Sequence, residues 1–255
     1  MSPINCSYSI EGKGPALFLI HGIGATRDAW RFVLSELIKK FTVITYDLRG
    51  HGSSPVSMDD FNLEDLVEDL ELLRNSTGFR SAFFAGHSLG GMIAPAYALK
   101  YPAHVKALGL LSTAAGRRTE DKNNVLNLIK LMEEKGISKI IPTLVNRWFT
   151  DDFVKKSPEI IQQRLQQVID TDPNTFFNVF RIYANTEMKS WLHKISVPTL
   201  VLTGENDKGC NPRLNKFIAN QLINSKLIIL PHFKHSILIE APNLAVSYTH
   251  LTLPT

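Results

Sequence analysis

Six short, mostly apolar runs recur along this chain of 255 residues. They lack the polar–apolar alternation of a strand with one face in water, so they fit parallel strands that are covered on both faces. Segments in which apolar residues recur at helical spacing separate these runs. The runs cover residues 16–20, 41–46, 81–86, 105–111, 197–203 and 226–230. This alternation predicts an α/β fold with a mostly parallel central sheet flanked by helices.

Residues 117–189 interrupt the alternation, because they contain helical segments and no strand candidate. These segments are residues 123–135, 137–149, 158–170 and 173–185. We therefore predict an α/β core formed by residues 1–116 and 190–255, with an all-helical cap inserted as residues 117–189. A closing helix is expected after Pro242, although its threonines and proline make residues 247–255 a poor helix end.

Residues 86–90 read Gly-His-Ser-Leu-Gly, at the junction between an apolar run and a helical segment. A strand that turns abruptly into a helix forces one residue into a strained backbone conformation. Gly86 and Gly90 remove the Cβ atoms that would clash in so tight a turn. The hydroxyl of Ser88 is then expected at the positive end of a helix, where developing negative charge is stabilised. Ser88 is therefore the candidate nucleophile.

This pattern resembles the nucleophile elbow of the α/β-hydrolase superfamily. The loop Asp-Leu-Arg-Gly-His-Gly at residues 47–52, the run at 197–201 and the segment around His235 carry the same resemblance. Within the superfamily the chain resembles small carboxylesterases and 3-oxoadipate enol-lactonases. The resemblance implies an α/β-hydrolase fold and hydrolysis through a Ser-His-Asp triad.

A serine hydroxyl is a weak nucleophile that needs a histidine base, and the base needs an acid to orient it. In the superfamily the chain order is serine, acid, histidine. Asp207 follows the fifth apolar run and is the acid that the resemblance implies, with Glu205 as its rival. His235 follows the sixth run and is the implied base, with His232 as its rival. Lys234 stands where family members usually have glycine.

The resemblance also implies an oxyanion hole made of two backbone N–H groups. Leu89, the residue after the nucleophile, supplies one of them. Ile23 follows His21-Gly22 at the end of the first apolar run and supplies the other. The histidines show no metal-ligand spacing, so we expect neither a metal nor another cofactor.

Composition and charge exclude several other classes. Apolar residues make up 44% and charged residues 20%, which is ordinary for a globular protein. The net charge of +4 comes from dispersed Lys and Arg, which does not predict a nucleic-acid partner. Cys6 and Cys210 form no disulfide framework, and no apolar run is long enough to span a membrane. We expect a cytoplasmic enzyme, and the sequence is compatible with a homodimer.

The cap segment is rich in large apolar side chains, some of which should face Ser88 and form an apolar pocket. We predict that the pocket contains Met92, Leu144, Trp148, Phe149 and Phe177. No basic cluster in the cap demands an acidic substrate, although Arg147 and Arg181 are candidate contacts.

The expected activity is hydrolysis of carboxylic esters through an acyl-enzyme, with short- to medium-chain apolar esters as substrates. An enol-lactonase or a C–C bond hydrolase on the same triad is the alternative. A third possibility is a non-catalytic, ligand-binding α/β-hydrolase. The presence of Ser88, Asp207 and His235 argues against it.

Overall fold

A computed structural model describes the backbone of residues 1–252 and the side chains of residues 1–247. Within this range a seven-stranded sheet has the order β1-β3-β2-β4-β5-β6-β7. Edge strand β1 runs antiparallel to β3, and the other neighbours are parallel. The strands are β1 Tyr8–Glu11, β2 Ala16–Ile20, β3 Thr42–Tyr46, β4 Ala82–His87, β5 Val105–Leu111, β6 Thr199–Gly204 and β7 Ser225–Leu230. The predicted mostly parallel sheet is confirmed.

Both faces of the sheet are buried, which explains why its strands are continuously apolar. In β4, for example, Phe84 stacks on Phe18 with ring centroids 5.1 Å apart. Its neighbour Phe83 points to the opposite face and contacts Phe41. Helices α2, α3 and α9 cover the first face, and α1, α10 and α11 cover the second.

The helices of the core follow the strands in regular alternation. The segment after β2 forms a 3₁₀ turn followed by α1, and Thr26 caps the turn by accepting the N–H of Asp28. The first half of the chain contains η1 Arg27–Trp30, α1 Arg31–Leu37, α2 Leu63–Ser76, α3 Gly90–Lys100 and η2 Pro102–His104. The second half contains η3 Leu192–Lys194, α9 Pro212–Gln221, α10 Ile237–Glu240 and α11 Pro242–Thr252.

The closing helix expected after Pro242 is present, and it continues through most of the residues predicted to make a poor helix end. Helix α11 extends to Thr252, and residues 253–255 lie outside the described part. Among the helices that the structure describes, none combines the length and apolar character needed to cross a bilayer.

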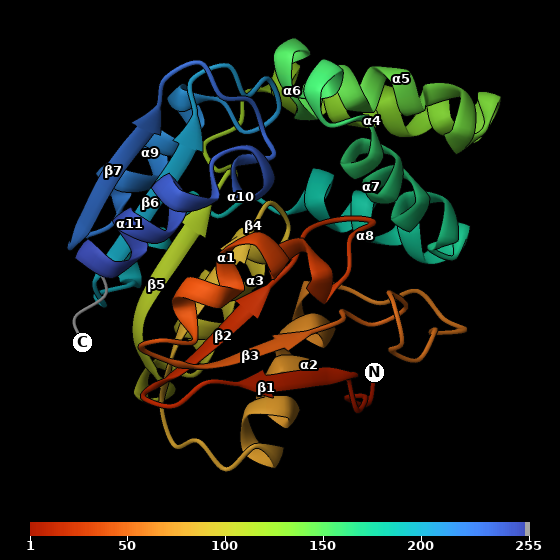
Figure 1. Cartoon of the computed structure of the whole chain (residues 1–255). Coiled ribbons are helices and arrows are strands. Elements are labelled where there is room, and N and C mark those ends of the chain that lie inside the picture. The colour runs from red at the N-terminus through yellow and green to blue at the C-terminus, as the bar shows by residue number, and fades with distance from the viewer. Residues whose placement is uncertain (253–255) are drawn as a thin grey trace.

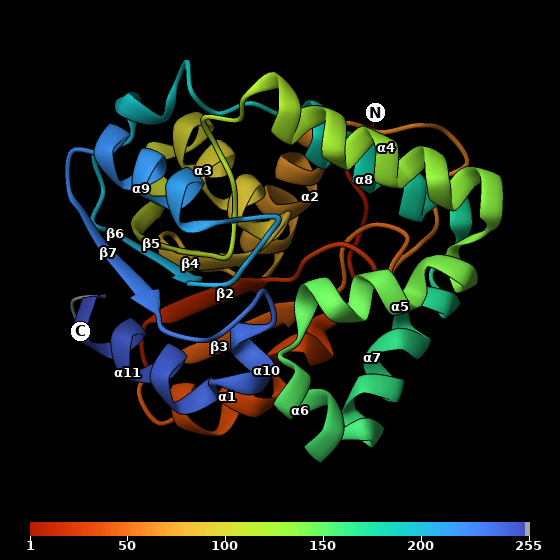
Figure 2. The same ribbon diagram turned by 90° about the horizontal axis from the view of Figure 1, so that it is seen from above.

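Five α-helices of the described residues lie between β5 and β6, and we use the name cap for them. They are α4 Thr119–Lys135, α5 Ile137–Trp148, α6 Asp151–Lys156, α7 Pro158–Asp170 and α8 Pro173–Asn185. Figure 1 shows them, green to teal, beyond the carboxyl ends of the parallel strands. From above, α5 and α7 lie side by side next to the loops of the core (Figure 2). Ligands of open α/β sheets bind at this end of the strands.

Candidate active site

Ser88 lies in a sharp turn between β4 and α3. Its φ of 56° is in the left-handed region, which is rare for a residue with a side chain. A Cβ on Gly86 would collide with the backbone of Gly90, and a Cβ on Gly90 would collide with the carbonyl of Ile20. Two backbone groups of Ser88 fix the turn. Its N–H donates to the Leu111 carbonyl at 2.9 Å, and its carbonyl accepts from the Thr113 hydroxyl at 2.8 Å.

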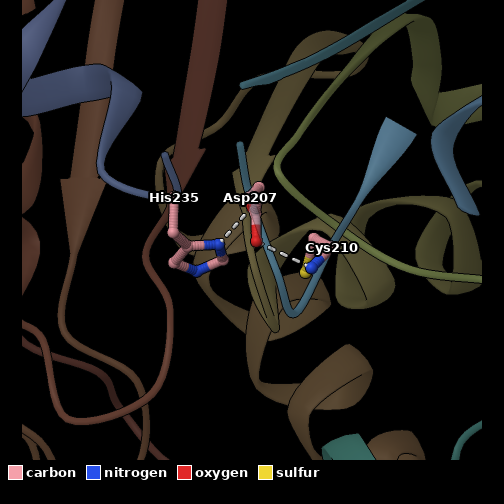
Figure 3. Close-up of side chains that lie close together, drawn as sticks. All are labelled: Asp207, Cys210 and His235. Carbon is pink, nitrogen blue, oxygen red and sulfur yellow. Dashed lines mark hydrogen bonds and ion pairs between the residues drawn. The ribbon is translucent and has the colours of Figure 1, made fainter. Parts of the chain in front are cut away.

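His235 and Asp207 come from the loops after β7 and β6 and form a direct bond. The Nδ1 atom of His235 lies 2.7 Å from Oδ2 of Asp207 (Figure 3). The other carboxylate oxygen, Oδ1, accepts the backbone N–H groups of Gly209 at 2.9 Å and Cys210 at 2.8 Å. The acid is therefore held by its own loop while it orients the imidazole.

In this pair each residue stabilises the charged form of the other. Burial opposes the charged form of Asp207, but His235 and the two backbone N–H groups outweigh it and hold the pKa of the carboxyl below its usual value. Burial likewise disfavours a charged His235, yet the charge and hydrogen bond of Asp207 raise its pKa above the ordinary 6.5.

The rival residues lie apart from this pair. Glu205 and His232 are exposed, and the Glu205 carboxylate accepts the backbone N–H of His232 at 2.9 Å. Lys234, at the position where glycine is usual, reaches into the cap. Its ammonium bonds the carbonyl of Asn146 and the carboxylate of Asp151, both at 3.0 Å. The loop that carries the candidate base is therefore tied to the cap.

The loop after β2 brings Ile23 next to Ser88. A Cβ on Gly22 would lie 2.9 Å from the Cβ of Ser88, so glycine is needed for this approach. Within residues 1–252 the N–H groups of Ile23 and Leu89 have no hydrogen-bond partner. Two unpaired backbone donors beside a strained serine are what an oxyanion hole requires.

Buried histidines shape this loop without acting as bases. His21 donates from Nδ1 to the Gly22 carbonyl at 2.8 Å, because its Nε2 accepts the N–H of Leu48 at 2.9 Å. Burial lowers the pKa of His21 well below the ordinary range and that of His51 to about 4. Both rings are therefore neutral at physiological pH and serve as structural hydrogen-bond partners.

A cavity of about 100 Å³ lies between Ser88 and the cap. Of the five predicted pocket residues, Leu144 and Trp148 line it. Met92 is instead fully buried in the core, and Phe149 is buried against Phe153, with ring centroids 5.7 Å apart.

The last predicted pocket residue, Phe177, also lies outside the cavity and packs against Phe176 and Arg181. The cavity wall instead contains Phe180, Val125 and Leu128. Apolar composition identified the cap as the wall but not which face of each helix points inward.

Two arginines also line this cavity. Arg147 was a candidate contact, whereas Arg164 had no distinguishing signal in the sequence. The other candidate, Arg181, lies outside the cavity and pairs with Glu133.

One group of described side chains combines atoms that metals prefer. Asp207, Cys210 and His235 present a carboxylate, a thiol and an imidazole within 4.8 Å of one another (Figure 3). The carboxylate is engaged as described above, and the thiol lies 3.1 Å from the hydroxyl of Tyr183. Cys210 is thus part of the wall behind the acid and base.

Comparison with known proteins places the chain in a family. The family model described as alpha/beta hydrolase fold matches residues 15–242. The chain belongs to the alpha/beta hydrolase fold family. The fold and the family resemblance predicted from the sequence are thereby confirmed.

Relatives within the alpha/beta hydrolase fold family carry several hydrolase names. The chain is 29% identical to 3-oxoadipate enol-lactonase 1 of Acinetobacter baylyi, over 79% of this chain and 75% of that one. It is 28% identical to monoacylglycerol lipase ABHD6 of Bos taurus, over 92% and 75%. A solved structure of a thermophilic esterase from Thermogutta terrifontis superposes with a TM-score of 0.87 and 26% identity, covering 96% of this chain and 92% of that one.

Proposed function

We propose that this hydrolase cleaves carboxylic esters through an acyl-enzyme formed on Ser88. One observation carries the proposal. The strained Ser88 and the bonded His235–Asp207 pair line the same cavity, beside the unpaired N–H groups of Ile23 and Leu89.

The proposed mechanism assigns each group one task. Ser88 Oγ attacks the ester carbonyl while His235 Nε2 takes its proton, and the N–H groups of Ile23 and Leu89 receive the oxyanion. His235 then protonates the leaving alcohol, and with its help water cleaves the acyl-enzyme. Asp207 holds the imidazole in the required tautomer, since its carboxylate accepts the Nδ1 proton.

The size and lining of the cavity favour small, mostly apolar substrates. A volume of about 100 Å³ is below the range of roughly 300–1,000 Å³ that is typical of drug-sized ligands. Leu144, Trp148 and Phe180 contribute to an apolar wall. We propose short- to medium-chain esters as substrates, with the acyl chain lying against this apolar wall.

The test uses p-nitrophenyl butyrate and a fluorophosphonate probe. Wild-type protein should hydrolyse the ester and be labelled at Ser88, whereas Ser88→Ala should lose both properties while its thermal unfolding is unchanged. Loss of the triad nucleophile costs on the order of 10⁶-fold in serine hydrolases. Undiminished turnover by the variant would contradict the proposal.

Enol-lactone hydrolysis on the same triad is the second candidate, and Arg147 favours it. Arg147 lines the cavity, and within the described residues its guanidinium forms neither an ion pair nor a hydrogen bond. A carboxylate on the substrate would satisfy it. Enol-lactonases are also among the relatives. Comparing kcat/KM for a lactone with and without a carboxylate decides between the two, because the second candidate predicts a preference for the acidic lactone that Arg147→Gln removes.

A further inference from the structure

Arg164 reaches from the cap to the backbone of the loop that carries Ile23. Its Nη2 donates to the Ile23 carbonyl at 3.0 Å, and its Nη1 donates to the Gly24 carbonyl. The guanidinium carbon, Cζ, lies over the ring of Trp148, 4.7 Å from the ring centroid. The group therefore sits between α5 and the loop, in the wall of the cavity.

No carboxylate among the described residues forms an ion pair with Arg164. Burial lowers the pKa of its guanidinium to about 10, so the group is still cationic at neutral pH. A cation removed from water without a counter-ion is costly unless other groups satisfy it. Here two carbonyl dipoles and an aromatic face perform that role, and Ile23 and Trp148, which supply one carbonyl and the aromatic face, line the cavity.

Side-chain hydrogen bonds to the peptide units around Ile23 bear on the direction of its N–H, the candidate oxyanion donor. The N–H of Ile23 belongs to the peptide unit whose carbonyl is that of Gly22, and His21 holds this carbonyl from one side. The next peptide unit, with the Ile23 carbonyl, is held by Arg164. The N–H of Gly24, in the same peptide unit as the Ile23 carbonyl, also donates to His51 Nε2 at 3.3 Å. Because glycines flank Ile23, the loop has little intrinsic preference for one orientation of these units. The side-chain hydrogen bonds therefore help to select it.

Neighbouring residues of α7 also contact this part of the core. Gln167 donates to the hydroxyl of Thr26 at 3.3 Å, and Gln163 accepts from Arg31 at 3.0 Å. These contacts also join α7 to the core, but neither reaches the carbonyls of Ile23 and Gly24. Arg164 alone among these three α7 residues does so.

We propose that Arg164 is a positioning residue that holds the loop so that the Ile23 N–H faces Ser88. The oxyanion hole is then complete only when α7 is seated on the core. This proposal rests on the proposed hydrolytic function. It predicts that Arg164 contributes to stabilisation of the transition state and little to binding of a neutral ester in the ground state.

The test replaces Arg164 by alanine and by lysine and measures kcat and KM with p-nitrophenyl butyrate. Both variants should lose on the order of 100-fold in kcat, the cost of losing an oxyanion donor, with KM within about threefold of wild type. Affinity for a boronic acid, whose tetrahedral adduct mimics the oxyanion, should fall by a similar factor. Guanidinium ion added to Arg164→Ala should restore part of kcat. Lysine keeps the charge but cannot span both carbonyls, so it also covers the case in which the alanine variant does not fold.

Gln163→Ala is the matched control, because it removes a bond between α7 and the core without touching the loop. It should retain wild-type kcat and boronate affinity. If Arg164→Lys keeps both values as well, the proposal is overturned. A defect confined to KM for carboxylate-bearing esters also overturns it and makes Arg164 a substrate-binding residue. Absence of turnover and of fluorophosphonate labelling in the wild type would instead defeat the hydrolytic function itself.

Discussion

The imidazole of His235 and the carboxylate of Asp207 are joined by a 2.7 Å bond that raises the pKa of the histidine above 6.5. As base, His235 must be neutral, and the neutral form appears only as the pH rises through this raised value. The acidic limb of kcat/KM should therefore lie above pH 6.5, since this parameter reports the free enzyme.

Asp207→Asn should move that limb toward lower pH, because burial still disfavours the imidazolium after its anionic partner is gone. The same change should lower kcat by on the order of 10⁴-fold, since an amide no longer selects the required tautomer. Proton NMR of the Nδ1 hydrogen across a pH titration measures the pKa directly. A midpoint that does not fall in the variant would contradict this account of the pair.

Gly90→Ala should abolish activity and strongly reduce folding yield, because the new Cβ would collide with the carbonyl of Ile20 in β2. Gly136→Ala is the control. A Cβ at that position would meet open space, although its φ of 85° is positive and that of Gly90 is not. The control should unfold with a free energy lower by roughly 1–3 kcal/mol, the cost of placing a side chain at backbone angles that glycine alone commonly adopts, and remain active. Equal losses in both variants would contradict the importance assigned to the close approach between Gly90 and β2.

Asp69→Asn should destabilise the fold by about 3–5 kcal/mol, because it leaves the Arg49 guanidinium buried without its partner. The two side chains are 1% and 2% exposed and bond at 2.6 and 2.8 Å. Glu36→Gln removes an exposed pair with Lys39 and should cost less than about 1 kcal/mol. Urea unfolding of both variants provides the comparison, and similar midpoints would refute the importance of burial here.

Leu144→Ala should enlarge the cavity next to Ser88 and raise the ratio of kcat/KM for octanoate over butyrate esters. Truncation of a buried leucine lowers the free energy of unfolding by about 2–5 kcal/mol. The assays are therefore run at temperatures well below the lowered Tm. Leu131→Ala on α4 is the control, since this residue packs in the cap without lining the cavity. An unchanged ratio in Leu144→Ala would place the acyl chain elsewhere.

Structure is predicted best from the sequence where the local residues permit a single backbone conformation. The run before Ser88 must be a buried strand because it is apolar and short, and the glycines on either side of the serine permit the tight turn. The candidate acid and base follow from the ends of later strands, and the structure brings Asp207 and His235 into contact.

The cap shows where such prediction ends. Trp148 and Phe149 are neighbours, yet only Trp148 lines the cavity. Phe149 follows the end of α5 with extended backbone angles of −121° and 148°, which turn its side chain away. Arg164 looks like any helical surface arginine in the sequence, because its contacts depend on how α7 docks against a loop 140 residues away.

The order of the site along the chain has a consequence for biosynthesis. Ile23 and Ser88 precede the cap, whereas Asp207 and His235 follow it, and β7 must pair with β6 before the loop of the base is in place. A nascent chain therefore carries its candidate nucleophile, without the candidate acid and base, through the synthesis of more than a hundred further residues. Under the proposed mechanism, we expect Ser88 to become reactive only when the last strand joins the sheet.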